Sequence, residues 1–115
     1  MGRDDGAIDL LPGTLELLIL KTLLAGQQHG YGIAQRLRVW SDDVLQVGES
    51  SLYPALQRLL QKAWVKAEWG ASENNRRARF YTLTAAGRKQ LGNERQEFDR
   101  LIVAIHKVLH AGSVA

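Results

Sequence analysis

Leucine and isoleucine occupy almost every side of a predicted helix over residues 14–25. Gly13 or Thr14 can cap its start, and Gly26 ends it because glycine accepts the left-handed conformation that follows many helices. A helix that is apolar on nearly all sides must be covered by several neighbours. We therefore expect this helix to lie within a core built from the other elements.

Two more helices follow before the periodicity changes. A turn at residues 27–30 leads into a helix that ends near residues 42–43. Residues 50–51 offer an N-cap for the next helix, and Pro54 falls in its first turn or just after it, where a missing N–H costs little. The buried face of this third helix follows the i, i+4, i+7, i+8 spacing in Leu52, Leu56, Leu59 and Leu60.

A period of two replaces the helical period after the third helix. Residues 64–69 and 79–83 alternate between apolar and polar, and the polar residues 70–77 separate them, which predicts a two-stranded hairpin with a long basic tip. Thr84 then caps a last helix. The order α-α-α-β-β-α predicts a winged helix-turn-helix, a mainly α fold with a small β-hairpin (α+β), followed by a long C-terminal helix.

Composition narrows the class of protein. A chain of 115 residues has room for one domain, and its 45% hydrophobic and 23% charged residues are those of a globular protein. The absence of cysteine excludes disulfides and thiolate zinc sites. The N-terminus lacks the pattern of a signal peptide, and the apolar stretch 15–25 is too short to span a bilayer. We expect a bacterial cytoplasmic protein with no membrane partner. The net charge of +3 is only weak evidence for a polyanionic partner.

The third helix has a polar outward face. Its side chains can contact base edges or phosphates if the helix lies in a major groove, which admits an α-helix. Gln57 and Arg58 could make bidentate contacts with adenine and guanine. Such a face alone is more often simply solvated, but its position just before a basic hairpin favours DNA. The candidate DNA-binding residues here are Ser50, Ser51, Tyr53, Pro54, Gln57 and Arg58.

The hairpin tip is the second candidate DNA contact. A wing can place arginine in a minor groove or on the phosphates beside it. The alternative is a solubilising loop, whose charge Glu68 and Glu73 would partly offset. The dense cluster of donors favours DNA contact. Its residues are Asn74, Asn75, Arg76, Arg77 and Arg79.

The last helix, over about residues 85–110, has an apolar stripe that a small core cannot cover. At 1.5 Å per residue it is about 35 Å long, so the stripe either folds back or pairs with a second chain. Pairing across a two-fold axis is the interpretation we favour, and it predicts a homodimer. The stripe, which Glu94 interrupts, consists of Leu91, Phe98, Leu101, Ile102, Ile105, Val108 and Leu109.

No constellation indicates catalysis. His106 and His110 have the i, i+4 spacing of shared metal ligands, but no carboxylate stands at a suitable offset beside them. His29 is expected to cap a helix or form a hydrogen bond in its turn. We expect no metal, no cofactor and no enzymatic activity.

Four segments together resemble the PadR family of transcriptional regulators. They are residues 13–20 (GTLELLIL), 29–33 (HGYGI), 51–59 (SLYPALQRL) and 79–87 (RFYTLTAAG). The resemblance covers about residues 13–110. It implies a winged helix domain, a C-terminal dimerisation helix, and repression of promoter DNA that a phenolic acid or drug often relieves.

Carried over by position, the family resemblance places Ser51, Tyr53 and Pro54 at the start of the recognition helix and residues 75–79 in the wing. Some family members stack flat aromatic effectors on tryptophans of the dimerisation helix. Only Phe98 offers a ring in that helix here. We expect the tryptophans to have a core role instead, and the existence and identity of a small-molecule effector stay open. They are Trp40, Trp64 and Trp69.

Taken together, these features predict a sequence-specific DNA-binding repressor that binds a near-palindromic operator as a homodimer. We assign residues 1–12 to a flexible arm, 13–84 to the DNA-binding domain, 85–110 to the dimerisation helix and 111–115 to a frayed tail. Two alternatives stay open. One is a winged-helix module that binds a partner protein without specific DNA binding, and the other is a small-molecule-binding protein.

Overall fold

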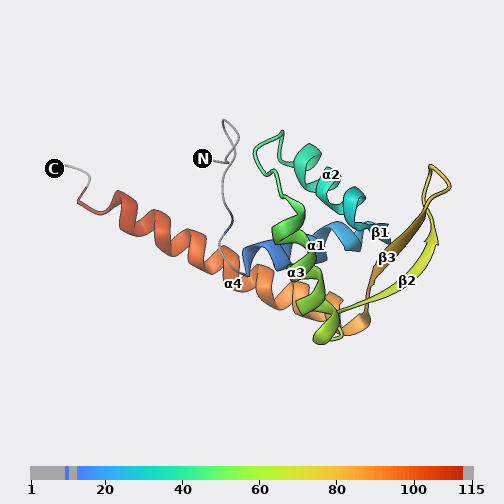
Figure 1. Ribbon diagram of the computed structural model, residues 1–115. Coiled ribbons are helices and arrows are strands. Elements are labelled where there is room, and N and C mark those ends of the chain that lie inside the picture. Colours follow the sequence, from blue (N-terminus) through green and yellow to red (C-terminus); the bar gives the residue numbers. More distant parts are fainter. Residues whose placement is uncertain (1–9, 11–12, 113–115) are drawn as a thin grey trace.

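The computed structural model describes residue 10 and residues 13–112, and it contains four helices and a small antiparallel sheet (Figure 1). The elements are α1 (Thr14–Leu24), β1 (Gln28–His29), α2 (Gly30–Trp40), α3 (Glu49–Gln61), β2 (Val65–Ala71), β3 (Arg77–Leu83) and α4 (Ala85–His110). The predicted mainly α winged helix fold is confirmed. Apart from residue 10, the expected N-terminal arm lies outside the described residues, as do residues 113–115 of the expected tail.

The sheet has three strands where the sequence predicted two. Its order is β1-β3-β2, and Gln28 and His29 pair antiparallel with Tyr81 and Phe80. The segment expected to be only a turn therefore covers the free edge of β3. Two residues are too few to show an alternating pattern, so this strand left no periodic signal.

Helix α3 starts at Glu49, two residues earlier than a cap at Ser50 would allow. Gly48 is its N-cap, and the carbonyl of Gly48 accepts from Leu52 N at 3.0 Å. Ser50 and Ser51 thus lie in the first turn and do not cap the helix. Pro54 follows in the second turn. Both serines and Pro54 are exposed.

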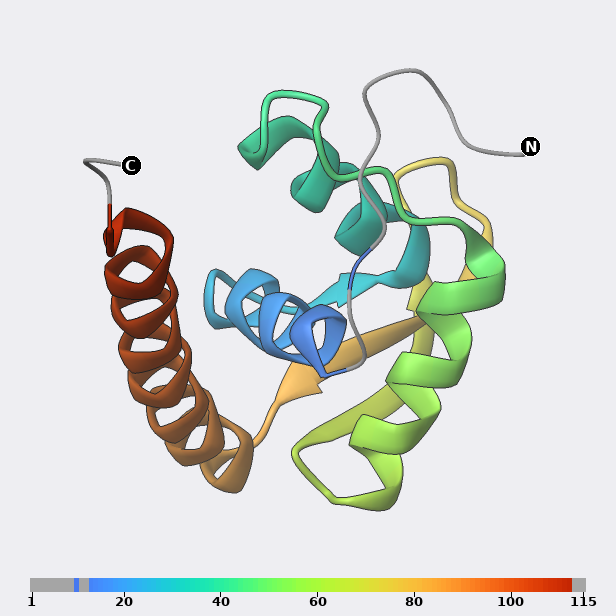
Figure 2. The same cartoon turned by 90° about the vertical axis from the view of Figure 1, so that its left-hand side faces the viewer.

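Helix α1 lies between the other helices, with α3 on one side and α4 on the other (Figure 2). This arrangement explains why its apolar residues surround it, since each neighbour covers a different side. The core is formed by buried residues from every helix and from β2 and β3: Leu15, Ile19, Leu20, Leu23, Ile33, Leu37, Leu52, Ala55, Leu56, Leu59, Val65, Tyr81 and Leu91.

The start of α4 is fixed to the core by two contacts. Thr84 Oγ1 accepts from Gly87 N at 3.0 Å and donates to Ala63 O at 2.8 Å, which confirms the predicted cap. A Cβ on Gly87 would lie 2.0 Å from Trp64 O. Only glycine therefore allows α4 to approach the hairpin this closely.

Leu91 corrects the predicted dimerisation stripe. It is 6% exposed and belongs to the core of its own chain. Gly87 and Leu91, in the first two turns of α4, are the buried residues of this helix, so one residue of the predicted stripe is already covered by its own chain. The rest of α4 extends away from the domain (Figure 1).

Among the described residues, none of the helices combines the length and the apolar character that a membrane span requires.

The tryptophans also depart from expectation. Trp64 is half-buried against the core, but Trp40 and Trp69 are 52% and 59% exposed. Trp40 ends α2, and Trp69 lies in β2, where it pairs with Arg79 of β3. The predicted core role is therefore wrong for these two.

Candidate nucleic-acid interface

One face of the β2–β3 hairpin, here called the wing, changes from apolar to basic along its length. Alternate residues of a strand share a face, and the register pairs Val65 with Leu83, Trp69 with Arg79, and Ala71 with Arg77. At its base this face contributes Val65 to the core. Toward the tip the same face bears the exposed arginines. The fold therefore aims Arg77 and Arg79 to the side on which the helices lie.

The arginines and the helices line one depression, here called the wing cleft, with a volume of about 610 Å³. The wing forms one side of it, and Gly30 and Tyr31 of α2 and Tyr53 of α3 lie on the other. The residues around it are His29, Gly30, Tyr31, Tyr53, Trp69, Ser72, Glu73, Asn74, Arg76, Arg77, Ala78, Arg79 and Tyr81. Five of the eleven predicted DNA contacts thus meet in one place: Tyr53, Asn74, Arg76, Arg77 and Arg79.

Tyr53 connects α3 to the first turn of α2. A Cβ added to Gly30 would lie 2.7 Å from the Tyr53 hydroxyl oxygen, so the ring rests where any other residue would place a side chain. Tyr53 is still 45% exposed. Gln57 is exposed one turn further along α3. The hydroxyl and the amide are both available to a ligand in front of α3.

Arg58 is held away from the position expected for a base contact. Its Nε lies 2.6 Å from Oε2 of Glu16 in α1, and the Arg58 side chain is half exposed. Burial alone would raise the pKa of the Glu16 carboxyl, but the hydrogen bond and charge of Arg58, together with backbone hydrogen bonds at Glu16 and Gly13, outweigh burial and lower that pKa. Arg58 therefore joins α3 to α1. The sequence signal for this contact was Glu16 itself, a lone acid within an apolar helix.

The tip of the wing is a short turn. Ser72 N donates to Arg76 O at 2.8 Å, and Asn75 has φ of 58°, a left-handed conformation that asparagine tolerates. The predicted tip at 70–77 is therefore narrower, because the strands extend to Ala71 and from Arg77. Asn74, Asn75 and Arg76 are exposed at its end.

The two arginines of β3, Arg77 and Arg79, each lie over an aromatic ring. The Arg77 guanidinium is 4.7 Å from the centroid of Trp69, and that of Arg79 is 5.9 Å from the centroid of Tyr81. Such contacts restrict a long side chain and leave its donors free.

His29 and Tyr31 are among the residues of the wing cleft that were not predicted as contacts. His29 Nδ1 accepts from Gly32 N at 3.0 Å, which confirms the expected capping role and places the ring at the start of α2. Tyr31 is 69% exposed beside it. Because they lie next to a strand that had no periodic signal, their proximity to the wing was not visible in the sequence.

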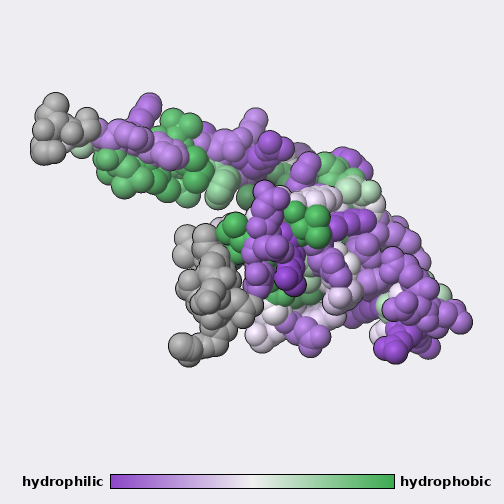
Figure 3. All heavy atoms as spheres, turned by 90° about the horizontal axis from the view of Figure 1, so that it is seen from above, coloured by the Kyte–Doolittle hydropathy of each residue, from purple (hydrophilic) through white to green (hydrophobic). Residues whose placement is uncertain are grey.

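The free half of α4 carries an exposed apolar stripe (Figure 3). Phe98 is 38% exposed and Leu101 is 55% exposed, and the exposed fraction rises to 74% at Val108. Ile105 and Leu109 are also exposed, and Ile102 is partly covered. In this chain by itself, the stripe thus stays largely in contact with solvent.

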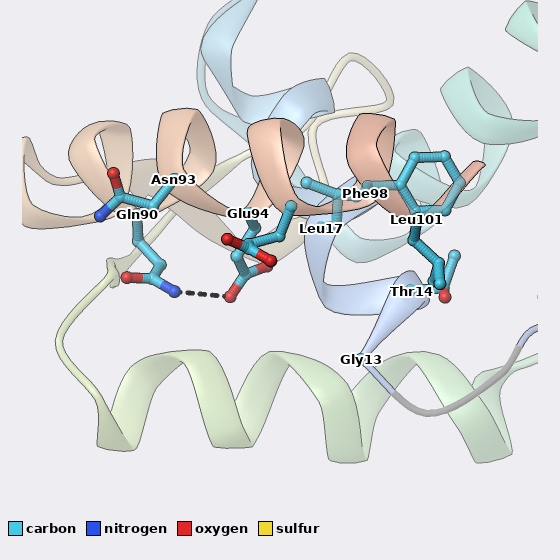
Figure 4. A pocket seen from close by; sticks show the side chains of 9 residues that line it. Gly13, Thr14, Leu17, Gln90, Asn93, Glu94, Phe98 and Leu101 are labelled. Atoms are coloured by element: carbon cyan, nitrogen blue, oxygen red, sulfur yellow. Dashed lines mark hydrogen bonds between the residues drawn. The ribbon is translucent and has the colours of Figure 1, made fainter. Parts of the chain in front are cut away.

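A groove of about 420 Å³ separates the start of α1 from the middle of α4 (Figure 4). Leu17 from α1 and Phe98 and Leu101 from α4 supply its apolar surface. Gln90 Nε2 donates to Glu94 Oε2 at 2.7 Å along its polar side. The groove continues the apolar stripe onto α1.

Within the described residues, no three His, Asp, Glu or Cys side chains gather in a way that could hold a metal ion. The rings of His106 and His110 are 6.0 Å apart, and His110 Nδ1 lies 2.7 Å from His106 O.

Comparison with known proteins identifies the same architecture elsewhere. The chain is similar to a transcriptional regulator from Clostridium thermocellum, with a TM-score of 0.76 and 28% identity over 83% of this chain and 92% of the other. It is also similar to a PadR family transcription regulator from Clostridium difficile, with a TM-score of 0.73 and 26% identity over 84% of this chain and 99% of the other. A protein from Lysinibacillus sphaericus is 29% identical over 72% of this chain and 76% of its own length.

The family model for PadR-like transcriptional regulators matches residues 19–93, which include α2, α3 and the wing. Members of this family are DNA-binding regulators of transcription and not enzymes. The fold, the wing cleft and the family match agree, and the chain belongs to the PadR-like family of transcriptional regulators.

Proposed function

We propose that this protein represses transcription as a homodimer bound to a near-palindromic operator. Helix α3 lies in the major groove, and the wing contacts the backbone or minor groove beside it. The observation that carries the proposal is the wing cleft, in which Tyr53 from α3 and Arg77 and Arg79 from the wing face one space. Exposed hydroxyl, amide and guanidinium donors directed to one side suit a polyanion with readable base edges.

The proposed contacts divide into two groups. On α3 they are Ser50, Ser51, Tyr53, Pro54 and Gln57, and on the wing they are Asn74, Asn75, Arg76, Arg77 and Arg79. Arg58 acts indirectly, because its ion pair with Glu16 sets the position of α3. Arg58→Ala should therefore weaken operator binding by moving the helix.

The dimer is proposed from the exposed stripe of α4. This helix has 26 residues, about 39 Å at 1.5 Å per residue. Its apolar side from Phe98 to Leu109 is largely exposed in the part of the chain that the structure describes. Two such stripes can cover each other across a two-fold axis, with the groove on α1 in the same interface. The two copies of α3 would then reach successive major grooves about 34 Å apart.

A small-molecule effector, if one acts on this protein, has a place in the groove between α1 and α4. The groove combines an aromatic ring, two leucines and the carboxylates of Glu94 and Glu97. A ligand there would alter the dimer and hence the spacing of the two α3 helices. Such a ligand should raise the melting temperature and weaken DNA binding together.

A footprint on the promoter of its own and neighbouring genes tests the proposed function. We expect two protected half-sites separated by about one helical turn. The variant Arg77→Ala/Arg79→Ala should lose protection. Lys66→Ala should keep the protection, because this substitution removes a positive charge from the opposite face of the wing. A stable dimer that protects no duplex at any salt concentration would contradict the proposal and favour a protein-binding module.

A further inference from the structure

We infer that Trp69 is a positioning residue for DNA recognition. Its indole ring holds the Arg77 guanidinium over the wing cleft, and the wing thereby prefers duplexes with a narrow, A·T-rich minor groove beside the major-groove half-site. The inference rests on the proposed DNA binding. It adds a residue outside the predicted contacts and a sequence preference outside the reach of α3.

Trp69 has no packing role that explains its place. Its side chain is 59% exposed, and it lines the wing cleft from the face of the wing that carries Arg77 and Arg79. The Arg77 guanidinium lies 4.7 Å from the ring centroid. Arg79 is the direct cross-strand neighbour of Trp69, so both arginines flank the ring on the same face. The contact that the tryptophan makes is with the cations of the wing.

The stack prepares Arg77 for binding. A free arginine has many rotamers, and fixing it in a complex costs conformational entropy. A guanidinium packs flat on an aromatic face, so part of this ordering is complete before DNA arrives. The position of Arg77 at the edge of the wing cleft means that the ordered group points toward the DNA site.

A narrow minor groove is the chemical partner that suits this group. A·T-rich tracts narrow the groove and concentrate negative potential in it, which attracts inserted arginine. The guanidinium is more weakly hydrated than the lysine ammonium and loses less on entering. The short turn between Ser72 and Arg76 lets the end of the wing approach such a groove.

The stack itself can be tested without DNA. An arginine side chain over an indole ring has its proton resonances shifted upfield by the ring current. We expect shifted Arg77 side-chain resonances in the wild-type protein, ordinary positions in Trp69→Ala, and a retained shift in Trp69→Phe. Ordinary Arg77 positions in the wild type would overturn the stack whatever the protein does with DNA.

The DNA preference is tested on the footprinted duplex with three flanks beside each half-site: A·T pairs, G·C pairs, or inosine·C pairs that lack the 2-amino group in the minor groove. The wild type should bind the A·T and inosine·C flanks about threefold to fivefold more tightly than the G·C flank, the size expected of an exposed cation–π contact. Trp69→Ala should lose this ratio. Trp69→Phe and Lys66→Ala should keep it.

The double variant Trp69→Ala/Arg77→Ala tests whether Trp69 affects DNA binding through Arg77 or independently of it. If Trp69 acts through Arg77, then Trp69→Ala/Arg77→Ala should bind no more weakly than Arg77→Ala alone. Additive losses would overturn the positioning role. If the wild type binds all three flanked duplexes with equal affinity while Arg77→Ala still weakens binding, the groove preference is overturned and the proposed function stays intact. A wild type that binds no duplex at all would overturn both.

Discussion

The Nε of Arg58 in α3 lies 2.6 Å from Oε2 of Glu16 in α1, and this ion pair joins the helix of the DNA site to the central helix of the core. The two residues are far apart in sequence, and Glu16 is only 8% exposed. A carboxylate this buried depends on its partner, because a charge without a counter-charge is costly away from water. The contact therefore links the stability of the core to the position of α3.

Glu16→Gln should lower the free energy of unfolding by about 1 kcal/mol at pH 7. Gln keeps an acceptor but loses the charge, and the half-exposed Arg58 is partly screened by solvent, which keeps the effect small. Urea unfolding at fixed protomer concentration measures it. Arg58→Ala should cost more than the double variant Arg58→Ala/Glu16→Leu, because the single variant leaves a buried charge unpaired.

The difference between wild type and Glu16→Gln should depend on pH with a defined sign. The pKa of Glu16 is lowered in the folded protein from its ordinary value of about 4.5. Its ionised form therefore stabilises the fold above that value, and the contribution is lost as the pH falls through the lower, folded-state pKa. The two unfolding free energies should converge in acid. A difference that stays constant or grows would contradict the ion pair.

Gly30→Ala should weaken operator binding through Tyr53. The added Cβ would lie 2.7 Å from the Tyr53 hydroxyl oxygen, and the exposed ring can turn away instead of straining the core. We expect a loss of about tenfold in affinity, the scale of one hydrogen bond to a charged phosphate, with stability changed by less than about 0.5 kcal/mol. Anisotropy titrations measure the affinity. In a Tyr53→Ala background the same substitution should have no further effect, and an equal loss there would refute the contact.

Gly87→Ala and Gly92→Ala should change stability in opposite directions, although both lie in α4. The Cβ at residue 87 would meet Trp64 O at 2.0 Å, so we expect a cost of about 1–3 kcal/mol. At residue 92 nothing lies within 4 Å, and the substitution should stabilise the helix by about 0.5–1 kcal/mol. Thermal unfolding of both variants checks the close approach of α4 to the hairpin. If the two substitutions changed stability equally, α4 would not approach Trp64 as closely as the structure shows.

Leu101→Asp should convert the proposed dimer into a folded monomer. Leu101 is 55% exposed in the single chain, so the charge costs little in the monomer but would be buried in a paired stripe. Light scattering across a range of concentrations measures the state, and circular dichroism reports the fold. Gln96→Asp, an exposed residue on the other side of α4, is the matched control and should stay dimeric. A dimer that survives Leu101→Asp unchanged would exclude this interface.

The element order was predictable because each change of periodicity is local. The helical stripes and the period-two strands identified three helices, a hairpin and a last helix. Strand β1 was not predicted, because two residues are too few to show a period. Leu91 was assigned to the wrong surface. A periodic stripe identifies the apolar side of a helix, but it does not tell which part of the helix packs on the core of the same chain. Trp69 was misplaced for a similar reason, because alternation identifies the face of a strand and does not tell which part of that face the core covers.

Arg58 shows the limit for the candidate site. Helical spacing placed it correctly on an exposed side of α3, but a long side chain can reach a partner in another element, and that partner depends on tertiary packing. The proximity of the wing arginines to Tyr53 likewise depends on tertiary packing. Sequence predicted each group separately, whereas the shared face of β3 and the register with β2 brought them together.

The salt dependence of operator binding tests the central claim most directly. Log K should fall linearly with log salt concentration for the wild type, and the slope should shrink by about 1 for each phosphate-contacting arginine removed. Arg77→Ala/Arg79→Ala should therefore bind more weakly with a shallower slope, while Lys66→Ala keeps the wild-type slope. A slope that does not differ between the two variants would contradict the assignment of the wing cleft as the DNA-binding surface.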